Sequence, residues 1–344
     1  MRLLFIKLKH IGDSLLLTPT LSAVRAEYPQ AQIWVVVRRG GEGILAGCSS
    51  IDRTLTSAEP EAKRRGAFNW LGDLRVLREL RQQRFDYSFE LSDGDRGRFL
   101  AWLSGAKTRC ANVAFKPLPW WWRSKFDAQS RYVWVNGHRV EKDFYTVNEF
   151  LPLGPEIPPL AFERERTEPW SPAEALRDFA VIHPGTRWIR KRWTQEKWIE
   201  LGRELFRFIP RLVVSSGPDS EEIALAGSIA KALGPAALST QGELSWAQLA
   251  GLLYRARLFV GVDTAAMHLA AACQCPTVAI FGPSAESQWR PWQVPHRVVK
   301  PAGLAQKESE ETMIQRVPTA EVAAACVELL KATGRPSGGA HETH

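Results

Sequence analysis

Residues 258–281 read LFVGVDTAAMHLAAACQCPTVAIF. The apolar run at 258–262 predicts a buried strand, 265–272 a helix and 277–281 a second strand. Two strands joined through a helix favour a right-handed crossover and a parallel sheet. The stretch therefore predicts an α/β fold whose sheet is covered by helices.

The same alternation continues on both sides of this stretch. Pro19 lies inside an expected helix at 14–27, which predicts either a kink there or a helix that begins near Thr18. The helix expected at 71–83 carries leucines at helical spacing on one predicted apolar face, namely Leu71, Leu74, Leu77 and Leu80. Further strands are expected at 3–8, 33–37, 87–91, 179–183 and 211–215, and further helices at 99–103, 195–208, 220–233, 244–254 and 319–332.

Residues 151–159, LPLGPEIPP, are rich in proline and glycine and predict a linker. A chain of 344 residues is long for one core and suits two. We expect two doubly wound, Rossmann-like domains at 1–155 and 156–333, followed by a mobile tail at 334–344. Ligands are expected in a cleft faced by the carboxyl ends of the strands.

Composition excludes several classes of protein. No run approaches the roughly 18 apolar residues of a spanning helix, and Lys7 interrupts the first apolar run, which argues against a signal peptide. The five cysteines show no metal or redox spacing and predict reduced thiols in a cytoplasmic protein.

Net charge is +8, which favours a polyanionic partner over a role in solubility alone. Residues 107–139 hold seven basic residues and one acid, Asp127, around the triplet Trp120-Trp121-Trp122. Tryptophan beside arginine suits an interface that is partly apolar and partly anionic, such as a membrane surface. Nucleic acid is a weaker alternative, because no aromatic pattern of a base-stacking module is present.

Four loops are expected to follow strands. In the first, residues 10–14, Asp13 is either a helix cap or a general base for an attacking hydroxyl. The second, residues 183–193, gathers Thr186, Arg187, Lys191 and further cations before a helix, which favours phosphate binding over a solvated charged loop.

The third loop, residues 215–222, is either a capping motif at Asp219 or Ser220 or a carboxylate for a ribose hydroxyl. In the fourth, Asp263 and Thr264 begin a helix, and His268 lies one turn on, facing the same way. The alternative is a plain cap with a core histidine. The glycines at 41 and 43 follow the wrong strand for a dinucleotide site, and no metal site is expected, so the phosphate charge needs protein cations.

Taken together, the motifs resemble those of the ADP-heptose:lipopolysaccharide heptosyltransferases. The matching segments are Lys7-x-x-x-Ile11-Gly12-Asp13, His183-Pro184-Gly185-Thr186, Lys191-x-Trp193, Val262-Asp263-Thr264-x-x-x-His268 and Phe281-Gly282-Pro283. The segments Ser216-Gly217-Pro218-Asp219 and Gln288-Trp289-Arg290-Pro291-Trp292 are most similar to the heptosyltransferase III branch.

The resemblance implies a GT-B fold, transfer of heptose from ADP-heptose with inversion, and no metal or other cofactor. It implies that Asp13 is the catalytic base and that Thr186 and Lys191 hold the donor phosphates. Glu221 or Glu222 would bind the ribose, and Asp263, Thr264 and His268 the heptose and diphosphate. We expect the lipopolysaccharide core acceptor at basic residues, namely Lys63, Arg64, Arg65, Arg123 and Lys125.

Three alternatives remain at this point. The chain is another GT-B hexosyltransferase, a nucleotide-sugar epimerase or a sugar-binding protein without activity. The acceptor sugar and the step of core synthesis are not fixed by the sequence.

Overall fold

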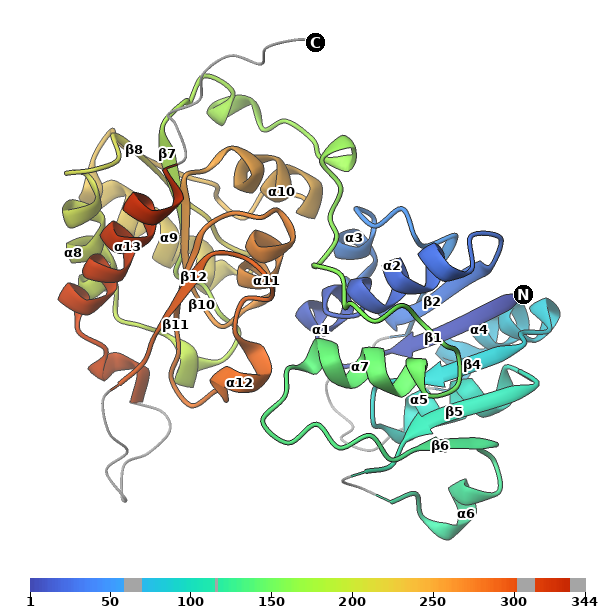
Figure 1. Ribbon diagram of the computed structural model, residues 1–344. Helices are drawn as coiled ribbons and strands as arrows, with labels where there is room; N and C mark the ends of the chain where they lie inside the picture. Colours follow the sequence, from blue (N-terminus) through green and yellow to red (C-terminus); the bar gives the residue numbers. More distant parts are fainter. Residues whose placement is uncertain (59–69, 115–116, 302–312, 335–344) are drawn as a thin grey trace. The chain divides into compact units, whose positions relative to one another are not determined.

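The computed structural model describes residues 1–58, 70–114, 117–301 and 313–334, apart from the side chains of 70–72. The chain divides into two compact units, Met1–Phe162 and Glu163–His344, each described here by itself (Figure 1). The expected boundary lay at 155/156. The division comes later because Leu160 and Phe162 are buried and the Ala161 N–H donates to Thr18 Oγ1 in unit 1 at 3.0 Å.

Unit 1 holds a parallel sheet of six strands in the order β3-β2-β1-β4-β5-β6. Residues 3–6 of β1 are completely buried, as a central strand between two covered faces requires. The strands are β1 (Arg2–Lys7), β2 (Gln32–Arg38), β3 (Arg53–Ser57), β4 (Tyr87–Glu90), β5 (Thr108–Asn112) and β6 (Ala128–Ser130).

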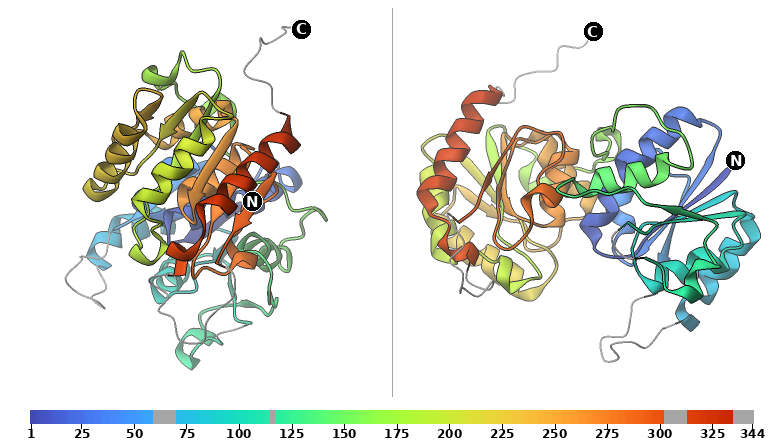
Figure 2. Two further views of the ribbon diagram at one scale, coloured as in Figure 1. Left: turned by 90° about the vertical axis from the view of Figure 1, so that its left-hand side faces the viewer. Right: turned by 60° about the horizontal axis from the view of Figure 1, so that its bottom comes forward.

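Helices cover both faces of this sheet (Figures 1 and 2). Helices α2 and α7 pack together on one side, and α4 and α5 pack together on the other. The helices are α1 (Ile11–Leu15), α2 (Thr18–Glu27), α3 (Glu42–Leu45), α4 (Trp70–Gln83), α5 (Asp95–Leu103), α6 (Trp120–Arg123) and α7 (Arg139–Asn148).

Of the two alternatives for residues 14–27, the helix that begins near Thr18 is confirmed, because α1 ends at Leu15 and α2 begins at Thr18 with Pro19 in its first turn, where proline is tolerated. The apolar face expected for the helix at 71–83 needs correction. In α4, Leu74 is 46% exposed, whereas Asp73, Val76 and Leu80 are buried. The buried face therefore lies away from Leu74, because spacing by threes drifts round a helix of 3.6 residues per turn.

Unit 2 repeats the architecture with a six-stranded parallel sheet in the order β12-β11-β10-β7-β8-β9. Counted within each unit, both sheets have the strand order 3-2-1-4-5-6 of a doubly wound fold, so the predicted fold class is confirmed. The strands are β7 (Phe179–His183), β8 (Arg211–Val214), β9 (Ala237–Ser239), β10 (Leu258–Val262), β11 (Thr277–Ile280) and β12 (His296–Val299).

Helices α8, α9 and α13 pack on one face of this sheet and α10 and α11 on the other. The buried Trp193 and Trp198 rings meet edge to face and join the core beneath α8. The helices are α8 (Gln195–Leu205), α9 (Ser220–Leu233), α10 (Trp246–Arg255), α11 (Ala265–Ala272), α12 (Glu286–Trp289) and α13 (Thr319–Thr333), with short 3-10 helices η1 (Arg164–Arg166), η2 (Ser171–Ala173), η3 (Ile189–Lys191) and η4 (Met313–Arg316).

Candidate active site residues

In each sheet the direction of winding reverses at the centre, between β1 and β4 in unit 1 and between β7 and β10 in unit 2. Loops that leave the carboxyl ends of such neighbouring strands separate and leave a crevice for ligands. Asp13 follows β1, Thr186 and Lys191 follow β7, and Asp263 follows β10. These four residues thus lie at the switch points of their own units.

Lys191 and Asp263 form an ion pair in unit 2. The Lys191 Nζ lies 2.5 Å from Asp263 Oδ2 and 3.5 Å from the Asp263 carbonyl oxygen. Both side chains are largely buried, at 18% and 8% exposure. Asp263 therefore holds a cation beside the first turn of α11, where free backbone N–H groups also attract anions.

Thr264 is the N-cap residue of α11, but its side chain makes no capping hydrogen bond. Its Oγ1 is buried, and within the described residues it has no hydrogen-bond partner. The alternative of a capping hydroxyl is wrong for Thr264. His268 is buried, and its N–H donates to the Thr264 carbonyl at 3.4 Å, one turn away as expected.

Glu221 and Glu222 have different surroundings. Glu221 is exposed and pairs with Arg192 at 2.8 Å. Glu222 Oε2 accepts from the Gly217 N–H at 3.1 Å, and a Cβ on Gly185 would lie 2.5 Å from the same oxygen. Glu222 thus lies against the loops after β7 and β8, and burial raises the pKa of its carboxyl.

Asp219 caps α9, because its Oδ1 accepts from the N–H groups of Glu221 and Glu222. The capping alternative is therefore right for Asp219. The Glu222 carboxylate takes no part in this cap, so capping by Asp219 is compatible with a ligand role for Glu222.

The loop after β7 carries the other predicted donor residues. Thr186 is buried, and its Oγ1 accepts from the Trp188 N–H at 3.3 Å. The guanidinium groups of Arg187 and Arg190 lie 5.2 and 5.7 Å from the Trp188 ring centre. Arginine stacked on tryptophan keeps its hydrogen-bond donors available at the ring edge, so Arg187 retains donors for an anion.

His183 ends β7 beneath this loop. Its Nδ1 is 2.9 Å from Ser215 Oγ, and its ring stacks on Phe259. Burial lowers the pKa of His183 to about 4, so the imidazole is neutral near pH 7. The sequence motif indicated no role for His183. In the structure its ring packs under the loop that follows β7.

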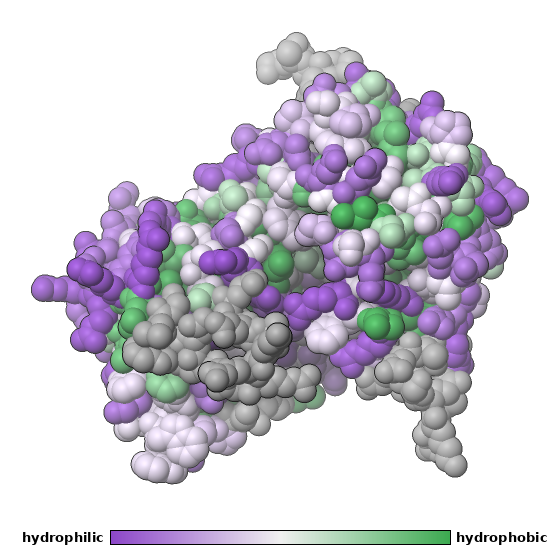
Figure 3. All heavy atoms as spheres, turned by 180° about the vertical axis from the view of Figure 1, so that it is seen from behind, coloured by the Kyte–Doolittle hydropathy of each residue, from purple (hydrophilic) through white to green (hydrophobic). Residues whose placement is uncertain are grey.

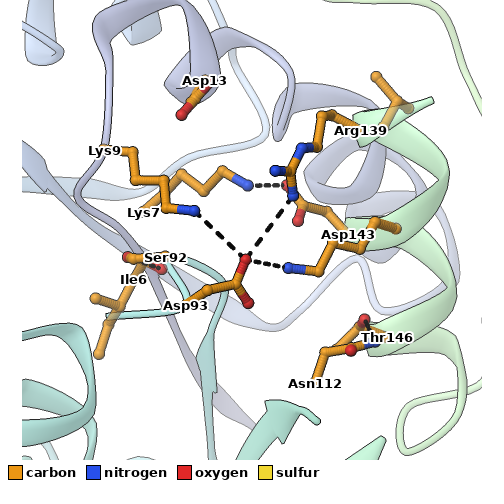
Figure 4. A network of polar contacts seen from close by, with 12 residues as sticks. Ile6, Lys7, Lys9, Asp13, Ser92, Asp93, Asn112, Arg139, Asp143 and Thr146 are labelled. Carbon is orange, nitrogen blue, oxygen red and sulfur yellow. Dashed lines mark hydrogen bonds and ion pairs between the residues drawn. The ribbon is translucent and has the colours of Figure 1, made fainter. Parts of the chain in front are cut away.

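In unit 1, Asp13 is buried in the first turn of α1, where its Oδ2 accepts from the His10 N–H at 3.3 Å. His10 is the N-cap residue and Asp13 is the N3 residue of a capping box, so Asp13 helps to cap α1 from N3 and not as the N-cap itself. Figure 4 shows the Asp13 carboxylate beside a network of charged side chains.

We refer to six residues of this network as the charged cluster, namely Lys7, Lys9, Asp93, Arg139, Lys142 and Asp143. Asp93 pairs with Lys142, and lies 3.6 Å from Lys9 and 3.8 Å from Arg139. Burial would raise the pKa of Asp93, but the charge and hydrogen bond of Lys142, together with the charges of Lys9 and Lys7, hold the pKa below its usual value. Sequence reasoning missed the cluster, although Val140, Phe144 and Val147 have the spacing of the helix that carries half of it.

The residues predicted to bind the acceptor are only partly described. Lys63, Arg64 and Arg65 lie outside the described residues. Arg123 is exposed in the segment around α6, and Lys125 Nζ lies 4.9 Å from the Trp102 ring centre. Trp122, expected as part of an exposed triplet, is instead buried, while Trp120 and Trp121 are 79% and 53% exposed.

Among the residues that the structure describes, no helix is long and apolar enough to cross a membrane. In the same part of the chain, no group of three or more histidine, cysteine or acidic side chains could hold a metal ion. All five cysteines are free thiols and buried.

Comparison with known proteins identifies the family. The model of glycosyltransferase family 9 (heptosyltransferase) matches residues 74–316. The chain is 27% identical to lipopolysaccharide heptosyltransferase 3 of Escherichia coli, over 93% of this chain and 96% of that one. It is 30% identical to lipopolysaccharide heptosyltransferase 1 of Pseudomonas aeruginosa, over 83% and 79%.

A solved structure of similar fold is E. coli ADP-heptose lipopolysaccharide heptosyltransferase II, with a TM-score of 0.77 and 18% identity over 97% of this chain and 100% of that one. The family is one of transferases, so the alternatives of an epimerase and of a nucleic-acid-binding protein are not supported. Because its model covers well over half of the residues, the chain belongs to glycosyltransferase family 9 and is a glycosyltransferase.

Proposed function

We propose that this enzyme transfers heptose from ADP-L-glycero-D-manno-heptose to the inner core of lipopolysaccharide, as a heptosyltransferase III. The observation that carries the proposal is the arrangement in unit 2 of Lys191, Asp263 and the uncommitted Thr264 hydroxyl at the first turn of α11, with Glu222 across the β7 loop. The likeness to relatives named heptosyltransferase 3 supports the step.

The donor fits these groups by its chemistry. A diphosphate needs cations and N–H donors, which Lys191, Arg187 and the α11 turn supply, with the Thr186 and Thr264 hydroxyls beside them. A ribose diol donates hydrogen bonds to a carboxylate, which Glu222 supplies. Asp263 orients Lys191, and His268 supports the first turn from one turn below.

The transfer proceeds by inversion at the sugar carbon. Asp13 accepts the proton of the acceptor hydroxyl as that oxygen attacks the face opposite ADP. The new glycosidic bond forms while the bond to the diphosphate breaks, and the developing negative charge is stabilised by Lys191 and the α11 N–H groups. With these cations available no metal is needed, so activity should persist in excess EDTA.

The acceptor, a phosphorylated and acidic saccharide, meets the cations of unit 1. Lys9 and Arg139 in the charged cluster are more accessible than the buried Lys7 and Lys142. We assign them to the acceptor together with the previously predicted Lys63, Arg64, Arg65, Arg123 and Lys125. A panel of core acceptors, each lacking one heptose, would identify the step, and transfer to an earlier acceptor alone would refute heptosyltransferase III.

Donor binding is tested with a matched pair of neighbouring glutamates. Glu222→Gln should weaken ADP binding by roughly 10- to 100-fold, because a hydrogen bond to a charged group is worth about 1.5–3 kcal/mol. Glu221→Gln should leave it within about twofold. Calorimetry with ADP and UDP measures both variants, and preference of the wild type for UDP would contradict an ADP-sugar donor.

The catalytic base is tested by Asp13→Asn. Turnover should fall by roughly 10²- to 10⁴-fold, the usual worth of a general base. The affinity for ADP should stay unchanged, since the proposed ADP contacts are in unit 2. Turnover near the wild-type rate would remove Asp13 from the mechanism.

The enzyme works on the cytoplasmic face of the inner membrane, where α6 contacts the lipid surface. Trp120 and Trp121 are exposed, while Trp122 packs on Phe99 at 4.7 Å and donates to Asp95 Oδ1 at 3.0 Å, which fixes the helix that presents them. Figure 3 shows a pale patch of intermediate hydropathy at the lower left, over the segment that includes α6.

Membrane contact is tested with vesicles containing anionic lipid. Trp120→Ser/Trp121→Ser should lose co-sedimentation, because tryptophan at the headgroup level supplies interfacial affinity. The control is Phe208→Ser, a change of an exposed aromatic residue in unit 2. Undiminished binding of the double variant would contradict the contact.

A further inference from the structure

Lys7 belongs to the motif that ends in Asp13, yet neither donor nor acceptor binding accounts for it. Its Nζ lies 2.5 Å from Asp143 Oδ2 on α7, and their side chains are 5% and 0% exposed. A buried ion pair usually contributes little net stability, because desolvation of two charges offsets their attraction. A role in stability alone is therefore a poor account of the pair.

The pair lies at the start of the loop that carries Asp13. Lys7 is the last residue of β1, and the next two residues are also tied down. The Leu8 N–H donates to Ser92 Oγ at 2.8 Å, and Lys9 reaches Asp93 at 3.6 Å. Ser92 Oγ in turn donates to the Ile6 carbonyl at 3.2 Å.

Helix α7 supplies the partners of the residues at both strand ends. Lys142, next to Asp143, pairs with Asp93, whose backbone adopts a left-handed φ of 56°. Non-glycine residues adopt that conformation at a cost and keep it where surroundings enforce it. Two adjacent residues of α7 thus contact residues at the ends of both β1 and β4, and Figure 4 shows Asp143 of α7 beside Lys7 and Asp93.

The Asp13 carboxylate accepts a long hydrogen bond from the His10 N–H, within its own turn of α1. The orientation of the Asp13 carboxylate therefore depends on the backbone of residues 8–12. The Lys7–Asp143 pair and the Ser92 contacts hold the start of this segment in place. We propose that Lys7 and Asp143 are positioning residues for Asp13. This inference rests on the proposed role of Asp13 as the base.

The test replaces the pair by apolar side chains of similar size, Lys7→Met/Asp143→Leu, so that neither charge is left buried alone. Such replacements are often neutral or stabilising, which separates positioning from stability. We expect the thermal midpoint to be retained and kcat to fall roughly 10- to 100-fold, since small misplacement of a reacting group costs that much. The Kd for ADP should not change.

A second readout does not depend on activity. Amide hydrogen exchange of residues 8–13 should become faster in the double variant than in the wild type. The matched control is Arg257→Met/Asp178→Leu, which removes a partly buried pair in unit 2 with an N–O distance of 3.1 Å. It should alter neither kcat nor exchange at residues 8–13.

Wild-type exchange and wild-type kcat in a stable Lys7→Met/Asp143→Leu protein would overturn the inference. Lack of heptose transfer by the wild type would overturn the proposed function instead, and the exchange measurement would still decide whether the pair orders the loop. If the double variant does not fold, Asp143→Glu replaces it. The displaced carboxylate should then lower kcat and leave ADP binding intact, and an unchanged kcat would count against positioning.

Discussion

At the scale of single residues, Glu90 is the clearest case of a side chain forced into an unusual state. It ends β4 two residues before Ser92, whose N–H donates to its Oε1 at 2.8 Å. Burial, with the nearby charge of Asp93, raises the pKa of Glu90 to about 7. The folded protein therefore keeps a proton on Glu90 at pH values where the unfolded chain has lost it.

This predicts a pH-dependent stability. Between about pH 4.5 and 7 the folded state binds more protons than the unfolded state at this site, so stability decreases as pH rises through that window. The Glu90→Gln protein should not lose stability in this window. Its free energy of unfolding should therefore exceed that of the wild type by a difference that grows up to pH 8. Chemical unfolding at pH 5 and pH 8 measures it, with the exposed Glu149→Gln as control. An advantage that does not grow with pH would contradict the prediction.

Single residues also mark what the sequence could and could not predict about the site. Segments that follow a strand are recognisable from the local sequence, so it could be predicted that Asp13, Lys191 and Asp263 each follow the end of a strand, as they do. Asp143 was not, because it meets Lys7 across 136 positions of the chain. Glu221 and Glu222 could not be separated either, since their surroundings depend on the loop at Gly185.

At the scale of elements, the buried central strands and the longest helices, α4, α9 and α13, were predicted closely, whereas β3, β5, β6, β9, β12 and the ten-residue helix α7 were missed. β6 and β9 have three residues each, and β3 reads Arg-Thr-Leu-Thr-Ser with little apolar alternation. Such strands are defined by the neighbour with which they pair rather than by their own pattern. The order of strands in each sheet therefore required the structure.

Helix caps give a prediction that separates stability from binding. Ser245 Oγ accepts from the Gln248 N–H at 3.1 Å in a capping box at α10, whereas Thr264 holds the same position at α11 without a side-chain bond. Ser245→Ala should cost about 1 kcal/mol of stability. Thr264→Ala should cost less and weaken ADP binding instead. Unfolding curves and ADP titrations of both proteins test the contrast, and equal stability losses would contradict it.

At the scale of the whole molecule, each unit has its own sheet and its own buried core. We predict that residues 163–344 fold alone, because their core includes buried residues from β7, β8, β10 and α8 without help from unit 1. The fragment should bind ADP within about threefold of the full chain, since the proposed donor contacts all lie inside it, and should not transfer heptose.

Calorimetry and thermal unfolding of this fragment check the prediction, with the full chain as reference. A fragment that unfolds without cooperativity would show that the division does not separate independently stable units. A well-folded fragment that fails to bind ADP would show that residues of unit 1 are needed in the donor site.

The Lys7–Asp143 pair has a further consequence during synthesis on the ribosome. Asp143, the partner of Lys7, is synthesised 136 residues after it. At roughly 5–20 residues per second, about 7–27 s pass between the synthesis of Lys7 and that of Asp143, which supplies its counterion. Lys7, at the end of β1, therefore cannot be buried beside its partner until α7 has left the exit tunnel. Unit 1 can reach its native core only after that point.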